Sequence, residues 1–481
     1  MFLFDRSALH DEPATRSFRA FVAALAICGS VSAGATDGAT NHHASYDLRV
    51  RLDPDDRDMH VEGRLTIPPP LPRPLRIALG RSFGTPQFHV VTEDGVDASP
   101  LPMREAWQAL LDDWNDANFA HELSHPYWGG DYLANEGMAT FAALETTQAS
   151  QGSAAAERFR RTGAPGYFEN ASGLGYLRIA AAGYDSPLAL PARLNGAAQN
   201  VDFGKGTFVL DMLAREVGRN GFHAFLRSYF AAQRRQEFSD FSWPGFFAAL
   251  SRATGRNMSY FYDEWFRREG APQWNLSWKR RGNAIEGALR QRGPIYRLRV
   301  PLEAIDQRGR VYRRALLVSQ RTTRFAWRLA TAPVELRDDP RYTILHWTPE
   351  YRALATAVIP FTRWGYKPYD GVEADLARSL VRVDRGDRYG LRFAVEYAWG
   401  RIEIRKSNWA QAQRLIAAAL QERVVRPELV PWAYLNLARV DSELKDHSGA
   451  HTALQRAFET ARRGNDDAAA ERVRRLLANS P

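Results

Sequence analysis

Residues 121–141 read HELSHPYWGGDYLANEGMATF, and this stretch decides how the rest of the chain is interpreted. It contains the pattern H-E-x-x-H, and the tripeptide Asn-Glu-Gly begins ten residues after the second histidine. Residues four apart on a helix project from one face, so His121 and His125 can reach a single cation. Glu122 lies on the adjoining flank, where its carboxylate can take a proton from a water molecule polarised by the metal.

A third ligand is needed, and Glu136 is the candidate. Gly129 and Gly130 are a turn signal between the two halves of the stretch. If an antiparallel helical hairpin folds at this pair, the carboxylate of Glu136 lies at the same level along the hairpin as the imidazoles of His121 and His125. The pattern therefore predicts a metal tripod of His121, His125 and Glu136. The alternative is a surface helix that carries two histidines without a metal.

The quoted stretch resembles the gluzincin aminopeptidases, the family of membrane alanyl aminopeptidase and leukotriene hydrolase. The family pattern is H-E-x-x-H-x-W-F-G, followed by W-L-N-E-G-F-A. The resemblance implies that His121, His125 and Glu136 are zinc ligands and that Glu122 is the general base. Two departures are plain: the family places roughly eighteen residues between the second histidine and the glutamate, whereas this chain has ten. In addition, Pro126 disfavours a helical conformation at His125.

Two later motifs extend the resemblance. GKGTFVLDML at residues 204–213 resembles the family's Y-x-K-G-A-x-V-L-x-M-L, and FYDEWFRREGAP at residues 261–272 resembles its F-x-x-W-x-x-x-x-G-x-P. In the family, the tyrosine of Y-x-K-G donates a hydrogen bond to the oxyanion, but here Phe203 stands in its place. Losing such a donor typically costs about 10²–10³ in turnover. We expect weak catalysis unless Tyr176 or Tyr184 supplies the missing hydroxyl.

The chain is long enough for several domains and is expected to be an α+β multidomain protein. Alternating runs indicate a truncated N-terminal β region, and a second set of alternating runs with turn signals resembles the family's small β-sandwich. In the tail, Ala412, Ile416 and Ala419 recur 38 residues later as Ala450, Leu454 and Ala457, which favours either a pair of tetratricopeptide-type hairpins or ordinary amphipathic helices. The predicted divisions are a signal peptide at 1–36, the β region at 45–100, a thermolysin-like helical catalytic domain at 103–272, a β-sandwich at 274–348 and a helical repeat-like domain at 373–481.

The net charge, the N-terminal segment and the position of the cysteine indicate which partners and which cellular location to expect. The net charge is +9, but the basic residues are spread along the chain without a run of five or six, which favours a solvated surface over a nucleic-acid face. Arg16 and Arg19 precede a short apolar run and then small residues, as in an export signal. The single cysteine, Cys28, lies inside that segment. We therefore expect a periplasmic or extracellular protein.

Together these features predict an exported zinc metallopeptidase that acts on peptides or proteins. The rival interpretation is a catalytically impaired family member that binds peptides, with a protein partner on the helical tail. The G-x-M-E-N motif with which family exopeptidases grip the substrate amine is missing upstream of His121. We therefore expect cleavage to depend little on a free N-terminus.

Overall fold

The computed structural model describes residues 45–53, 58–66, 90–91, 97–98, 116–125, 135–163, 169–190, 196–235 and 241–478. The predicted export segment and the turn at Gly129 and Gly130 lie outside the described residues. The chain divides into two compact units, residues 1–130 and 131–481, and each is described by itself.

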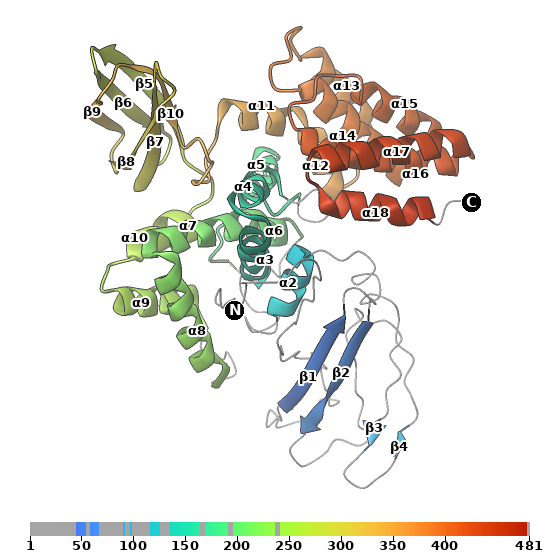
Figure 1. Ribbon diagram of the computed structural model, residues 1–481, viewed down its shortest axis with the longest axis horizontal. Helices are drawn as coiled ribbons and strands as arrows, with labels where there is room; N and C mark the ends of the chain where they lie inside the picture. The colour runs from blue at the N-terminus through green and yellow to red at the C-terminus, as the bar shows by residue number, and fades with distance from the viewer. Residues whose placement is uncertain are drawn as a thin grey trace. The chain divides into compact units, whose positions relative to one another are not determined.

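The described residues of the first unit form two antiparallel strand pairs and one helix. Strand β1 (Ser45–Asp53) pairs with β2 (Asp58–Thr66), and β3 (Val90–Val91) pairs with β4 (Asp97–Ala98) (Figure 1). Both long strands coincide with runs of alternating polar and apolar residues in the sequence. Helix α2 (Asp116–Ser124) carries the H-E-x-x-H pattern and ends one residue before His125. Pro126 accounts for this end, because a proline disfavours the helical conformation of the preceding residue.

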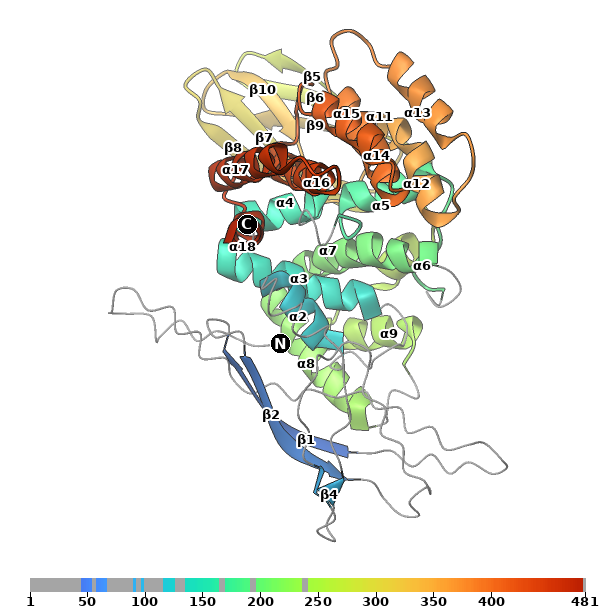
Figure 2. The ribbon, with the colours of Figure 1, turned by 90° about the vertical axis from the view of Figure 1, so that its right-hand side faces the viewer.

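The second unit begins with a helical region whose apolar side chains form a large aromatic core. Trp243 and Trp265 are among its fully buried side chains. The side chain of Ser172 accepts a hydrogen bond from the backbone N–H of Gly175, and that of Ser242 accepts one from the backbone N–H of Gly245. Each serine thus caps the helix that follows it. The elements are α3 (Asn135–Gln151), α4 (Ser153–Thr162), α5 (Gly173–Ala181), α6 (Gly196–Val201), the π-helix η4 (Asp202–Gly206), α7 (Thr207–Val217), α8 (Arg219–Arg235), α9 (Trp243–Thr254), α10 (Ser259–Phe261) and the π-helix η5 (Tyr262–Phe266) (Figure 2).

Two antiparallel three-stranded sheets follow in the same unit. One has the order β5-β6-β9, and the other has the order β10-β7-β8. Leu298, Val300, Leu302 and Ala304 alternate along β7 and are buried, as expected for a strand with one face in a core. The bounds are β5 (Gln273–Arg281), β6 (Ala284–Arg292), β7 (Leu298–Asp306), β8 (Val311–Val318), β9 (Thr322–Arg328) and β10 (Pro333–Asp338).

Helices complete the chain, and the repeated residues of the tail are all buried in α15 and α17. Helix α14 packs on α15, and α16 packs on α17, so the tail contains successive helical hairpins. The tetratricopeptide assignment stays a prediction. The bounds are α11 (Pro349–Ala357), α12 (Ile359–Tyr366), α13 (Val372–Val381), α14 (Leu391–Arg405), α15 (Trp409–Ala419), the 3₁₀ helix η6 (Pro427–Leu429), α16 (Val430–Glu443), α17 (His447–Arg463) and α18 (Asp467–Ala478).

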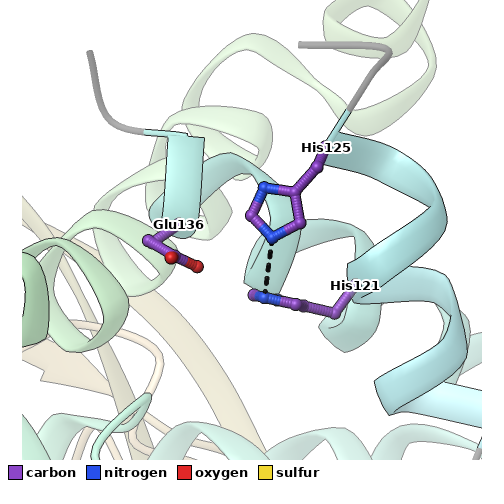
Figure 3. Close-up of side chains that lie close together, drawn as sticks. All are labelled: His121, His125 and Glu136. Atoms are coloured by element: carbon purple, nitrogen blue, oxygen red, sulfur yellow. Dashed lines mark hydrogen bonds between the residues drawn. The ribbon is translucent and has the colours of Figure 1, made fainter. Parts of the chain in front are cut away.

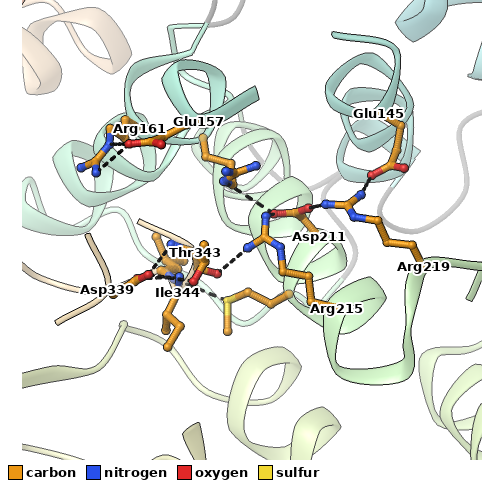
Figure 4. A network of polar contacts seen from close by, with 12 residues as sticks. Glu145, Glu157, Arg161, Asp211, Arg215, Arg219, Asp339, Thr343 and Ile344 are labelled. Carbon is orange, nitrogen blue, oxygen red and sulfur yellow. Dashed lines mark hydrogen bonds and ion pairs between the residues drawn. The ribbon is translucent and has the colours of Figure 1, made fainter. Parts of the chain in front are cut away.

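A buried carboxylate joins the helices of the second unit to the segment after β10 (Figure 4). Asp211 of α7 is completely buried and accepts hydrogen bonds from Arg215 at 2.5 Å and Arg219 at 2.6 Å. The Nε atom of Arg160, on α4, lies 3.9 Å from the same carboxylate. Arg215 also donates to the carbonyl of Thr343 at 2.9 Å. A buried carboxylate requires such partners, because desolvation of an uncompensated charge is costly.

The combination of helices and antiparallel sheets agrees with the predicted α+β class. The boundaries of the predicted domains remain predictions. Among the residues that the structure describes, none belongs to a helix with the length and apolar character needed to cross a membrane.

Candidate metal centre

The two histidines of the H-E-x-x-H pattern face each other in the first unit. The Nε2 atoms of His121 and His125 are 3.1 Å apart, and the rings meet edge to face with centroids 4.7 Å apart. A zinc ion with Zn–N distances of about 2.0–2.1 Å in a tetrahedral site holds neighbouring nitrogens roughly 3.3 Å apart. The two imidazoles therefore already have the separation that one shared ion requires. His121 is buried, which favours a rigid ligand position.

Glu136 belongs to the first turn of α3 in the second unit. Its Oε1 atom accepts a hydrogen bond of 2.9 Å from the side-chain amide of Gln199 on α6. A carboxylate in the first turn of a helix also interacts favourably with the helix dipole. Gln199 did not emerge from the sequence, because an isolated glutamine 63 positions away in the chain has no recognisable pattern.

Figure 3 shows the three predicted ligands, whose side chains lie close together. One ligand atom from each of His121, His125 and Glu136 lies within 4.8 Å of the other two. Two imidazole nitrogens and one carboxylate oxygen are the protein ligands of a common type of catalytic zinc site. The His and Glu cluster is therefore compatible with a metal ion. Glu122 lies in α2 between the two histidines, but its side chain is outside the described residues.

The first turn of α3 is fixed by a residue that the sequence analysis missed. Asp202, the first residue of η4, is buried and accepts the backbone N–H of Gly137 at 3.2 Å. A Cβ atom at Gly137 would lie 2.8 Å from Asp202 Oδ1 and 3.1 Å from the Cα of Gly206. The glycine after Glu136 is therefore required for the close approach of α3 to η4. Burial raises the pKa of Asp202 to about 7, although its bond from Gly137 acts in the opposite direction.

The hydroxyl group of Tyr176 is engaged inside the core. Phe203 is partly buried in η4. The hydroxyl of Tyr176 donates to Asp185 Oδ2 at 2.8 Å, and the side chain is completely buried. The same carboxylate oxygen accepts the backbone N–H of Gly270 at 2.6 Å. Because this hydroxyl proton is already used in the protein interior, Tyr176 is a packing residue. Tyr184 packs its ring on Tyr366, with centroids 4.9 Å apart.

Lys205, the lysine of the family-like Gly-Lys-Gly sequence, has a structural contact. Its side chain is completely buried, and its Nζ atom donates to the carbonyl of Arg268 at 2.6 Å. The ammonium also lies 5.5 Å from the centroid of the Tyr176 ring. Burial lowers the pKa of Lys205 to about 8. The lysine thus ties η4 to the segment after η5 and connects the two later motifs of the sequence.

Comparisons with known proteins give limited information. No protein-family model matches the chain, and no curated protein matches it. Among solved structures, the chain is similar to that of Legionella pneumophila aminopeptidase A in complex with aspartic acid, with 14% sequence identity and a TM-score of 0.39. The match covers 74% of this chain and 47% of that one, so it spans about half of the aminopeptidase. At this TM-score the similarity establishes neither a shared fold nor a shared activity.

Proposed function

We propose that the protein is a zinc-dependent metallopeptidase of gluzincin type that hydrolyses peptide bonds. The observation that carries the proposal is the grouping of His121, His125 and Glu136, whose ligand atoms lie within 4.8 Å of one another. The separation of the two Nε2 atoms supports it, because 3.1 Å is close to the spacing of two nitrogens on one tetrahedral zinc.

Each residue of the site would have its own role in hydrolysis. The zinc, when bound, would act as a Lewis acid that polarises the substrate carbonyl and lowers the pKa of a water molecule. His121 and His125 would each offer a neutral Nε2 atom, and Glu136 would offer a carboxylate oxygen. Glu122 would accept the proton of the attacking water and then transfer it to the nitrogen of the leaving amine. Its position in the sequence between His121 and His125 supports this role.

The proposed substrates are peptides or proteins, with little requirement for a free N-terminus. Family exopeptidases use the glutamate of G-x-M-E-N to bind the substrate amine, and this chain lacks that motif before His121. A site with a buried carboxylate for an ammonium group rejects blocked substrates strongly. One peptide, free and N-acetylated, should therefore be cut at similar rates, and mass spectrometry identifies the bonds broken. A preference of about 10³ or more for the free peptide would contradict this proposal.

The second candidate is a catalytically impaired member that binds peptides at the same centre. Phe203 supports it, since a phenylalanine has no hydroxyl for the oxyanion, and the hydroxyl of Tyr176 is bonded to Asp185. A broad peptide-library digest separates the two candidates. For the enzyme, wild-type protein cuts and Glu122→Gln does not, while both bind zinc equally. A wild-type protein that binds zinc and peptides but cuts none supports the second candidate.

The cellular context is also a proposal. The N-terminal segment with its Arg16, Arg19 and following apolar run supports export to a periplasmic or extracellular location. We propose that the helical hairpins of the tail, in which α14 packs on α15 and α16 packs on α17, bind a protein partner. Fractionation of cells that produce the full chain tests the location, and the mass of the mature N-terminus tests removal of the signal.

A further inference from the structure

A cavity in the second unit lies away from the candidate ligands and is lined by charged side chains. It has a volume of about 40 Å³ and lies between α5 and the helices α11 and α14. These three helices are neighbours in Figure 1, and α11 packs on both of the others. The charged residues of its wall are Arg178, Arg401, Arg426 and Glu169. Three guanidinium groups therefore face a single carboxylate.

That carboxylate is already engaged by one of the arginines. Arg401 donates to Glu169 Oε2 at 2.8 Å, and the two side chains are 29% and 20% exposed, so the pair is accessible to solvent. Arg401 also lies against the rings of Phe361 and Tyr397, with its guanidinium carbon 5.3 and 5.8 Å from their centroids. These contacts fix the direction of Arg401. Among the described residues of the cavity wall, Glu169 is the one carboxylate, and it is shared by all three arginines.

Arg178 and Arg426 interact with acids only at longer range. Both guanidiniums interact electrostatically with Glu169, and Arg426 also interacts with Glu428 and Glu350. Among the residues that the structure describes, no hydrogen bond or salt bridge joins either guanidinium to a carboxylate. Glu428, two positions after Arg426, accepts a hydrogen bond from Thr162 at 3.2 Å. Burial lowers the pKa of Arg178 to about 10; the charge of Glu169 opposes this shift, and the charges of Arg426 and Arg401 add to it. Partly buried cations that repel one another are stable only with a compensating charge.

We propose that this cavity binds a small oxyanion, a phosphate or a carboxylate group, between Arg178, Arg401 and Arg426. The planar guanidinium forks match the oxygens of both groups and can bind them with two parallel hydrogen bonds. A cavity of about 40 Å³ holds a few water molecules or one such group. Its position on α5, α11 and α14 means that the anion links the catalytic helical region to the tail.

The test is thermal unfolding of the full chain in inorganic phosphate, in acetate and in chloride at equal ionic strength, with isothermal titration calorimetry of the more stabilising anion. We expect phosphate or acetate to raise the melting temperature above that in chloride. If only phosphate raises the melting temperature, the natural ligand is of the phosphate type. If only acetate does so, the ligand is a carboxylate. Arg178→Gln and Arg426→Gln should each weaken binding of that anion at least tenfold. In chloride the two variants should be about as stable as the wild type, since each removes one of three neighbouring positive charges that repel one another.

A matched control separates a built site from general attraction to a basic protein. Arg385→Gln removes the same charge from an exposed position outside the cavity, and it should leave anion binding unchanged. The proposal is wrong if neither anion stabilises the wild type beyond chloride, or if Arg385→Gln weakens binding as much as the cavity variants. If a glutamine variant does not fold, Arg426→Lys, which keeps the charge but loses the fork, should bind the anion at least threefold more weakly than the wild type.

Discussion

Replacing Gly137 with alanine should displace Glu136, the proposed third ligand of the metal centre. This glycine follows Glu136 in α3, and an added Cβ would lie 2.8 Å from Asp202 Oδ1, 3.0 Å from the Asp202 carbonyl oxygen and 3.1 Å from the Cα of Gly206. Two of these three neighbours are backbone atoms, which cannot rotate away. The first turn of α3 must therefore shift, and Glu136 must shift with it.

The magnitude follows from two opposing terms. Alanine in place of glycine inside a helix gains about 0.8–1.0 kcal/mol from helix propensity. Overpacking of a tight contact costs about 1–3 kcal/mol, so Gly137→Ala should lose up to about 2 kcal/mol of folding free energy. Gly221 in α8 is the matched control, because its nearest neighbour to an added Cβ is a side-chain carbon of Val217 at 3.8 Å. Gly221→Ala should therefore gain up to about 1 kcal/mol.

Urea unfolding of the metal-free proteins, followed by tryptophan fluorescence, measures this difference. Zinc affinity, measured by competition with a chromophoric chelator, is the second readout. A shift of Glu136 should weaken zinc binding by about 10–100-fold, the usual effect of disturbing the groups that orient a metal ligand. Gly221→Ala should bind zinc like the wild type. If Gly137→Ala is as stable as the control and binds zinc equally well, then the glycine contact does not position the ligand.

Other expected outcomes concern stability, pH and turnover. Asp211→Asn should cost about 3–5 kcal/mol in urea unfolding, since it removes the carboxylate that pairs with the buried Arg160 and with Arg215 and Arg219. Asp263→Asn, in a pair whose side chains are 65% and 47% exposed, should cost less than about 1 kcal/mol. Burial and the nearby Glu422 raise the pKa of Glu396 from 4.5 to about 7. The folded protein therefore loses stability as the pH rises from 4.5 to about 7, because this carboxyl ionises at a cost in the folded state. Glu396→Gln should stabilise the protein by about 1–2 kcal/mol at pH 8 and should give no gain at pH 4. The value at pH 8 is reduced for solvent screening, because the side chain is only partly buried. Equal changes in unfolding free energy at the two pH values would contradict this prediction. Phe203→Tyr should raise peptide turnover by roughly one to two orders of magnitude if this position faces the oxyanion, and steady-state kinetics with unchanged zinc content would detect it.

Local periodicity accounts for the parts of the molecule that the sequence predicted. Alternation marked β1 and β2, and the four-residue spacing of His121 and His125 brought the two imidazoles together, with His121 in α2 and His125 directly after its end. The effect of Pro126 was also local, and the helix ends where that proline requires. Such features depend on neighbours within one or two turns, so a single sequence is enough to find them.

The supporting contacts of the centre could not be predicted, because they join positions far apart in the chain. Asp202 meets Gly137 across 65 positions, and Gln199 meets Glu136 across 63. The sequence offered Tyr176 as a replacement hydroxyl donor, since nothing near it in the chain shows that Asp185 takes its proton inside a core. Which polar groups are used up by burial depends on tertiary packing.

Zinc stoichiometry tests the central claim most directly. The wild-type chain, loaded with zinc and dialysed against metal-free buffer, should retain about one zinc per chain by elemental mass spectrometry. His121→Ala and His125→Ala should retain none after the same dialysis, and Glu136→Gln should retain much less than one. Glu122→Gln should retain as much zinc as the wild type, because this glutamate is not a proposed ligand. A wild-type chain that keeps no zinc, or a His121→Ala chain that keeps as much as the wild type, would contradict the proposed metal centre.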